Sequence, residues 1–292
     1  MHSLAKPSQP VKLHSKDRTL MWLQSAPLLE SLKGQVSKAL GRDTFRPTPD
    51  EYSFLASYPR SGNTWLRSVL FDYTMGRPPH NLAEIDCRIP DEHHPIRSSL
   101  LLKELGPEPK SRHIAKTHAL FTVDRGYRRA LYVIRDPRHV ISSYFRYRKR
   151  LSVTDFGAFC ENCVLGSQWP GSWHDHVLSW TQGASSRIEG FAVVRYEDLV
   201  SHNTSAITAF ASALGLSDAQ RLSNLMHWYD LEKMKHLEAA GNRENEPARS
   251  DSGNSFIGNG KAPEDQYGFI DTLIREKSPH WLPMMERFGY DA

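Results

Sequence analysis

The chain has 292 residues, of which 37 are lysine or arginine and 33 are aspartate or glutamate, so its formal net charge is +4. This length suits one α/β domain, and the small basic excess suits an anionic ligand better than nucleic acid. Because the chain start lacks the apolar core of a signal peptide and no apolar run approaches the about 20 residues of a membrane span, we expect a soluble, cytoplasmic protein with no membrane partner.

Two regions are expected. Residues 1–50 combine a helical stretch with a polar segment that prolines interrupt. They are predicted to pack as a lead-in on the main domain, 51–292.

The main domain begins with a strand, a polar loop and a helix. Alternating apolar residues predict a strand that stops before Pro59, which has no N–H to donate. From Thr64 onward apolar residues recur at three- and four-residue steps, which predicts an amphipathic helix that Gly76 ends. Between strand and helix lie a cation, hydroxyls and a flexible glycine, contributed by Arg60, Ser61, Gly62, Asn63 and Thr64. Because the N–H groups of a helix N-terminus bind anions, this stretch predicts a phosphate cradle. The G-x-x-x-x-G-K-[ST] spacing of nucleotide triphosphatases is absent.

The following segments predict a parallel sheet. Residues 77–95 are interpreted as irregular, and their histidines as loop residues rather than metal ligands. Strands are expected at 113–118, 130–134 and 191–195, with helices between and after them. Asp136 as N-cap and Pro137 as first helical residue are predicted to start the helix after 130–134. The strand 191–195 is expected to be followed by a turn, Tyr196 to Leu199, and then by a helix that Gly215 ends. Alternating strands and helices predict an α/β fold, a single domain whose mainly parallel central sheet is flanked by helices.

Four polar residues stand at or just past the ends of predicted strands, namely Arg60, His118, Arg135 and Tyr196. Ligands of open parallel sheets bind outside the carboxyl ends of the strands. These residues are therefore predicted to meet in one crevice.

The loop from Tyr58 to Trp65 reads Tyr-Pro-Arg-Ser-Gly-Asn-Thr-Trp. It resembles the 5′-phosphosulfate loop of the cytosolic-type sulfotransferases, and the chain is identified as a bacterial-like member of that family. The resemblance implies a P-loop-kinase-like sulfotransferase fold. It also implies 3′-phosphoadenosine 5′-phosphosulfate (PAPS) as sulfuryl donor, adenosine 3′,5′-bisphosphate (PAP) as product and no metal.

Further stretches are similar to the family. Arg135 and Ser143 match the pair that holds the 3′-phosphate, and Lys116-Thr117-His118 matches the motif whose histidine is the catalytic base. A histidine base typically contributes a factor of about 100 to 10,000 in rate. The resemblance implies catalytic roles for His118, Lys116 and Arg60. It also places Trp65 and Tyr196 beside the adenine base.

The closing segment departs from the family. Phe256 to Lys261 lacks the family's paired cations and tryptophan, although Asn259, Gly260 and Lys261 are assigned to the nucleotide. This departure leaves an aryl sulfate open as an alternative donor. The basic run Arg146 to Arg150 is interpreted as a solvated helix face. The non-enzymatic alternative is a polyanion-binding protein without catalysis that uses the arginine-rich helix from Arg138 to Arg150. A kinase is disfavoured, because no lysine follows the glycine of the loop.

The expected reaction is in-line sulfuryl transfer to a hydroxyl group of a small-molecule acceptor. No nucleic-acid partner is expected, and a homodimer is a possible assembly. Cys160 and Cys163 form a C-x-x-C pair, which is interpreted as two thiols on one helix face.

Overall fold

The computed structural model describes residues 44–45, 47–48, 51–93, 96–97, 113–149, 151–240, 257–258 and 260–291. The chain divides into two compact units, Met1–Thr44 and Phe45–Ala292, and the second is considered below. The predicted lead-in of residues 1–50 lies almost wholly outside the described residues, so this domain division stays a prediction.

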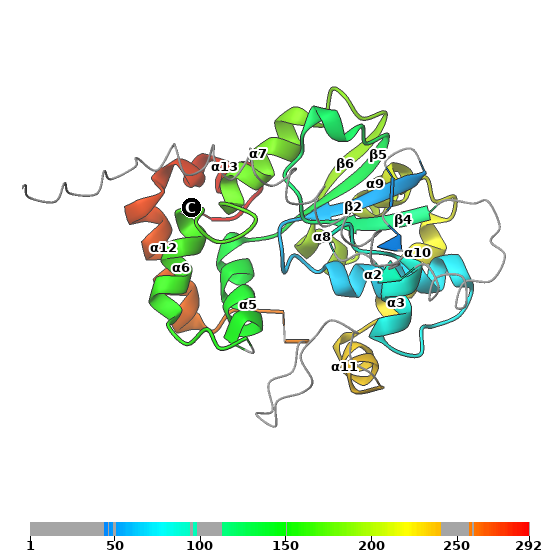
Figure 1. The fold of residues 1–292 in the computed structure, drawn as a ribbon, viewed down its shortest axis with the longest axis horizontal. Coiled ribbons are helices and arrows are strands. Elements are labelled where there is room, and N and C mark those ends of the chain that lie inside the picture. The colour runs from blue at the N-terminus through cyan, green and yellow to red at the C-terminus, as the bar shows by residue number, and fades with distance from the viewer. Residues whose placement is uncertain are drawn as a thin grey trace, which may run out of the picture. The chain divides into compact units, whose positions relative to one another are not determined.

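A four-stranded parallel sheet lies at the centre of the second unit (Figure 1), in the order β4-β2-β5-β6. Its strands are β2 (Tyr52–Ser57), β4 (His113–Thr117), β5 (Arg129–Ile134) and β6 (Gly190–Arg195). Phe54 of β2 lies opposite Ala115 of β4 and Ala130 of β5, which sets the register. Two short strands, β1 (Thr44–Phe45) and β3 (Ile96–Arg97), pair separately. The predicted parallel sheet is confirmed.

Alternation along the central strands divides the core into two layers. In β5, Tyr132 and Ile134 pack into one layer and Leu131 and Val133 into the other, because successive side chains point to opposite faces. All four side chains are almost fully buried. Burying each of these side chains stabilises the fold by about 1.5–3 kcal/mol relative to leaving it exposed. For Tyr132, the cost of burying the hydroxyl group reduces this gain.

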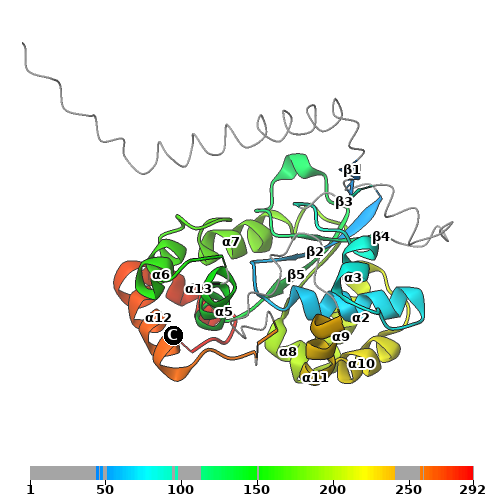
Figure 2. The same cartoon turned by 60° about the horizontal axis from the view of Figure 1, so that its bottom comes forward.

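Helices flank the sheet in two groups, one for each layer of the core, and most of the second group gathers beyond one end of the strands rather than over a face (Figures 1 and 2). One group consists of α2 (Asn63–Met75), α3 (Leu82–Arg88), α9 (Thr204–Leu214), α10 (Ala219–Trp228) and α11 (Leu231–Ala240). The other consists of α5 (Pro137–Lys149), α6 (Phe156–Val164), α7 (Trp173–Gly183), α12 (Glu264–Lys277) and α13 (Leu282–Arg287). Short elements complete the described part: α8 (Tyr196–Val200) and two 3-10 helices, Val123–Arg125 and Pro279–Trp281.

Local signals end and start the helices where they were predicted to. Gly76 follows α2 with φ 71° and Gly215 follows α9 with φ 67°, a conformation that glycine adopts without a steric penalty. Pro137 is the first residue of α5, and the Asp136 carboxylate accepts a hydrogen bond of 2.8 Å from the Arg138 backbone N–H.

Two expectations of irregular structure were wrong. Within 77–95 the chain forms α3, because the Asn81 side chain accepts a hydrogen bond of 3.0 Å from the Glu84 N–H and caps the helix. Leu82 and Ile85 give this helix a buried face. The turn expected after β6 is the short helix α8.

Cys160 and Cys163 are both fully buried in α6 and carry free thiols, which confirms two thiols on one helix face. Burial raises the pKa of the Cys160 thiol to about 12. Across the described part of the chain, no helix is both long and apolar enough to cross a membrane.

Candidate active site

The predicted site residues meet at the carboxyl edge of the sheet. The loop after β2, His118 after β4, Arg135 after β5 and Tyr196 after β6 all follow the last residue of their strand. In the sheet, β2 lies between β4 and β5. The next central strand along the chain, β4, pairs with one edge of β2, whereas β5 and β6 follow at its other edge, so the chain reverses its direction across the sheet and β2 ends at a topological switch point. Ligand sites of such sheets form at this position.

The cradle loop has an unusual backbone. Arg60 has φ 72° and Gly62 has φ 93°, and Gly62 directly precedes the first residue of α2. A Cβ atom added at Gly62 would lie 2.4 Å from the Tyr196 ring, so the ring packs on bare backbone. The loop therefore holds the positive N-terminus of α2 at the sheet edge, where it favours an anion.

Three buried polar atoms of this loop and its neighbour have no hydrogen-bond partner in the structure: Ser61 Oγ, Asn63 Oδ1 and Arg135 Nε. Leaving a buried donor or acceptor unpaired costs about 1–3 kcal/mol. Two of the three can donate a hydrogen bond to a phosphate or sulfuryl oxygen. The residues present therefore fit a multiply charged anionic ligand.

Arginines converge beside the loop. The Ser143 Oγ atom accepts hydrogen bonds of 3.2 Å from both Arg60 Nε and Arg146 Nη2. Arg135 Nη1 donates to the Arg60 carbonyl oxygen at 2.9 Å. Burial, with a smaller effect of the nearby Arg135 guanidinium, lowers the pKa of Arg146. Like charges held so closely mark a site for an anion.

The interpretation of Arg146 as part of a solvated helix face was wrong. Its side chain is half-buried on α5, hydrogen-bonds to Ser143 and lies against the backbone of Gly258 in the closing segment. Sequence reasoning could have found it, because Arg146 stands three residues after Ser143 and therefore on the same face of the helix.

The closing segment meets the site through Gly260, whose carbonyl oxygen accepts a hydrogen bond from Arg135 Nη2. The Arg135 guanidinium also lies 4.3 Å from the centre of the Tyr196 ring. Trp65 packs edge-on against the same tyrosine, with ring centroids 5.8 Å apart. Lys261 is exposed, and Asn259 lies outside the described residues.

His118 lies against the end of β2. Its Nδ1 atom is 2.6 Å from the Ser57 carbonyl oxygen and 3.5 Å from Ser57 Oγ, which in turn accepts a hydrogen bond of 2.8 Å from Asn63 Nδ2. A carbonyl oxygen only accepts, so Nδ1 carries the ring proton and Nε2 has the lone pair of a base. Burial and the nearby Lys116 ammonium hold the pKa of His118 well below its usual range. The ring is therefore neutral at pH 7.

His176 was not assigned to the site, but it holds the backbone of His118. Its Nε2 atom donates to the His118 carbonyl oxygen at 3.1 Å, and its Nδ1 atom accepts from the Tyr132 hydroxyl at 2.8 Å. His176 is fully buried on α7, and burial lowers its pKa to about 4. His176 therefore links β5 and α7 to the backbone of His118.

The buried neutral His176 is expected to make the protein less stable in acid. An unfolded histidine titrates near pH 6.5, so below that pH the unfolded chain binds a proton that the folded state refuses. This stability is complete above about pH 6.5 and is lost as the pH falls towards 4, by roughly 3 kcal/mol. Urea unfolding at several pH values measures it, and His176→Gln should show a flatter pH dependence. An equally steep decline in that variant would contradict the assignment.

Lys116 lies beside His118 but is engaged elsewhere. Its ammonium forms a buried ion pair of 2.5 Å with Asp91. The Asp91 carboxylate therefore neutralises much of the positive charge that Lys116 could direct at an anionic ligand. Among the described residues, no group of three or more His, Cys, Asp or Glu side chains gathers as a metal site would require.

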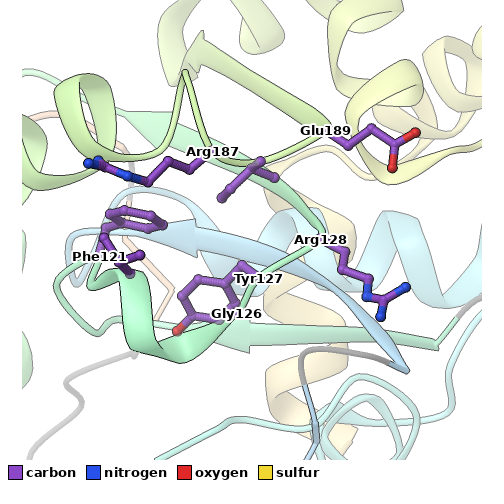
Figure 3. A pocket seen from close by; sticks show the side chains of 8 residues that line it. Phe121, Gly126, Tyr127, Arg128, Arg187 and Glu189 are labelled. Atoms are coloured by element: carbon purple, nitrogen blue, oxygen red, sulfur yellow. The ribbon is translucent and has the colours of Figure 1, made fainter.

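A pocket of about 370 Å³ lies outside this site (Figure 3). Arg128 and Glu189 stand at one end, Phe121 and Arg187 at the other, and Tyr127 lies between them. Arg128 and Glu189 directly precede β5 and β6, so the pocket borders the amino ends of these strands rather than their carboxyl ends.

Arg146→Met is expected to weaken PAP binding about tenfold, because a hydrogen bond with a charged partner contributes at least about 1.5 kcal/mol. Arg187→Met is the matched control, since Arg187 lines the pocket at the other edge of the sheet. Calorimetric titration with PAP measures both. If both variants bind PAP with the same affinity, Arg146 does not take part in binding PAP.

Comparison with known proteins agrees with this geometry. A model of the sulfotransferase domain family matches residues 50–276. Flavonol 3-sulfotransferase of Flaveria bidentis is 24% identical over 267 residues, which are 85% of this chain and 84% of the relative. Sulfotransferase 4A1 of Mus musculus is 24% identical over 182 residues, and the match spans 59% of this chain and 63% of that relative.

Solved structures share the fold. Mouse sulfotransferase SULT7A1 complexed with PAP has a TM-score of 0.55 at 22% identity, covering 85% of this chain and 91% of that chain. Retinol dehydratase in complex with androsterone and PAP has a TM-score of 0.55 at 20% identity, covering 79% of this chain and 81% of that chain. With a family model matched across most of its length and this fold, the chain belongs to the sulfotransferase family.

Proposed function

We propose that the protein transfers the sulfuryl group of PAPS to a hydroxyl group of a small acceptor, with His118 as general base. When bound, PAPS supplies the activated sulfuryl group, and PAP is the product that leaves. The observation that carries the proposal is the place of His118: its Nδ1 atom is bound to the last residue of β2, directly before the anion loop, and Nε2 keeps its lone pair.

The loop and the arginines suit the two ends of the nucleotide. Ser61, Gly62, Asn63 and Thr64, at the N-terminus of α2, would hold the 5′ end, together with Arg60. Arg135 and Ser143 would hold the 3′-phosphate, and Arg146 would supply a cation that the closing segment lacks. The structures of SULT7A1 and retinol dehydratase both contain PAP, which supports this assignment.

His118 Nε2 would take the proton of the acceptor hydroxyl as its oxygen attacks sulfur. The bond from sulfur to the 5′-phosphate oxygen would break in the same step, the electron pair would stay on the departing 5′-phosphate of PAP, and Arg60 would stabilise the negative charge that develops there. Lys116 would help to stabilise negative charge on the sulfuryl oxygens, although its ion pair with Asp91 weakens this effect. The proposed step requires no metal, because arginines and the start of α2 supply the positive charge.

Two measurements test the proposal. Calorimetry with PAP tests the nucleotide site, and incubation with PAPS and phenol, followed by mass spectrometry for phenyl sulfate, tests the transfer. Tight PAP binding and product only with both substrates are expected. No binding of PAP, with transfer from an aryl sulfate instead, would replace the donor and keep the reaction.

Two arginines of the helix that would bind a polyanion have partners inside the protein and do not add to its exposed positive surface. Arg138 is bound to Asp136 and Asp271, and Arg146 is turned towards Ser143. A heparin titration that PAP does not compete with would favour this alternative. A cytoplasmic location and a homodimer remain proposals, which cell fractionation and light scattering would test.

A further inference from the structure

Residues 90–93 are bound along the outer edge of β4. The Lys116 N–H donates to the Pro90 carbonyl oxygen at 2.8 Å, and the Glu92 N–H donates to the Lys116 carbonyl oxygen at 2.9 Å. The Lys116–Asp91 ion pair and the Arg125–Glu92 ion pair add side-chain bonds. Residues 90–93 are therefore fixed next to β4, the strand that His118 directly follows.

This attachment places His93 beside an aromatic neighbour of the base. The rings of His93 and Trp169 are 5.2 Å apart, and those of His118 and Trp169 are 6.3 Å apart, both in edge-on geometry. The Tyr144 hydroxyl holds Trp169 by donating to its carbonyl oxygen at 2.9 Å. Trp169 is nevertheless 43% exposed, so its indole offers an apolar surface next to the two imidazoles.

His93 has an unused polar atom at this place. Its Nε2 atom is buried and has no hydrogen-bond partner in the structure. Burial lowers the pKa of His93, so the ring is neutral at pH 7. An unpaired buried nitrogen is costly unless a ligand uses it.

The charges around these rings cancel. Lys116 is paired with Asp91 and Arg125 with Glu92, whereas Arg60, Arg135 and Arg146 gather on the donor side. An anionic acceptor would find no net positive charge beside His93. An uncharged acceptor suits this side of the site.

We propose that the acceptor is an uncharged phenol with a second hydrogen-bonding group next to its reacting hydroxyl. This inference rests on the proposed function and deepens it. The aromatic ring packs on Trp169, the reacting hydroxyl meets His118, and the neighbouring group is bound by His93 Nε2. His93 is a specificity-determining residue, and Trp169 supplies the apolar surface.

The test compares catechol, phenol and salicylate as acceptors with PAPS as donor. The wild-type kcat/KM for catechol is expected to exceed that for phenol about tenfold, the worth of one hydrogen bond, and salicylate is expected to be poorest. His93→Phe should bring the catechol-to-phenol ratio close to one. His93→Gln, which keeps a polar atom near the position of Nε2, should restore most of the ratio.

His236→Phe is the control, because His236 is an exposed histidine of α11, and it should leave the ratio unchanged. Calorimetry of catechol with the PAP-saturated protein separates the two proposals. Weaker catechol binding in His93→Phe without turnover in any variant would overturn the transfer reaction alone. Turnover with an unchanged ratio in His93→Phe, or a preference for salicylate, would overturn the role of His93.

Discussion

His118→Ala is expected to lower kcat/KM for sulfuryl transfer by about 100- to 10,000-fold, the usual contribution of a general base. The affinity for PAP should stay within about twofold, because Nδ1 of the ring lies against Ser57 at the end of β2, which is not among the residues proposed to hold the nucleotide. Initial rates with PAPS and phenol, together with PAP calorimetry, measure both quantities.

The wild-type pH profile offers an independent check on the base. A base acts only when unprotonated, and burial with the Lys116 charge holds the pKa of His118 well below that of a free histidine. The acid limb of kcat/KM is therefore expected below pH 6.5, the ordinary histidine pKa, rather than at it. His236→Ala serves as the control for His118→Ala. Unaltered turnover in His118→Ala would remove the proposed mechanism.

Gly62→Ala is expected to weaken PAP binding about a hundredfold. An alanine at φ 93° costs about 1–2 kcal/mol, and its Cβ atom would lie 2.4 Å from the Tyr196 ring. Moving the ring adds about 1–3 kcal/mol of overpacking and disturbs the Arg135 guanidinium that packs on it. Calorimetry with PAP and thermal unfolding measure the effects on binding and stability.

Gly76→Ala is the matched control, at the other end of the same helix. Gly76 has φ 71°, but nothing lies within 4 Å of an added Cβ atom. This variant should lose a similar amount of stability through its backbone and bind PAP as the wild type does. Equal PAP affinities of Gly62→Ala and Gly76→Ala would show that the contact with Tyr196 plays no part in the cradle.

Strong local signals made most of the fold predictable. The buried run of β5, the stop at Pro59 and the glycines after α2 and α9 each act within a few residues, so the four central strands and the helices α2, α5 and α9 followed from the chain alone. The helix α3 was missed because it has only seven residues, and its signal is one capping side chain with two apolar residues. Short helices depend on packing more than on propensity.

The parallel sheet also placed the site. Because the strands run in the same direction, every loop after a strand falls at one edge, and the positions of Arg60, His118, Arg135 and Tyr196 could be predicted without knowing the strand order. The hydrogen-bond and ion-pair partners of these side chains could not be predicted from the sequence. The bond of His176 to the His118 carbonyl oxygen, the pairing of Lys116 with Asp91 and the turn of Arg146 towards Ser143 join residues from separate elements.

The sequence by itself therefore determined the α/β fold, since strand and helix patterns depend on residue types at short spacing, and it predicted the anion loop and the histidine that we propose as the base. Only the tertiary structure decided which nitrogen of His118 keeps its lone pair, which arginines gather beside the loop and which side chains lie next to His118. Hydrogen-bond partners and burial set these properties, and both arise from contacts between segments far apart in the chain.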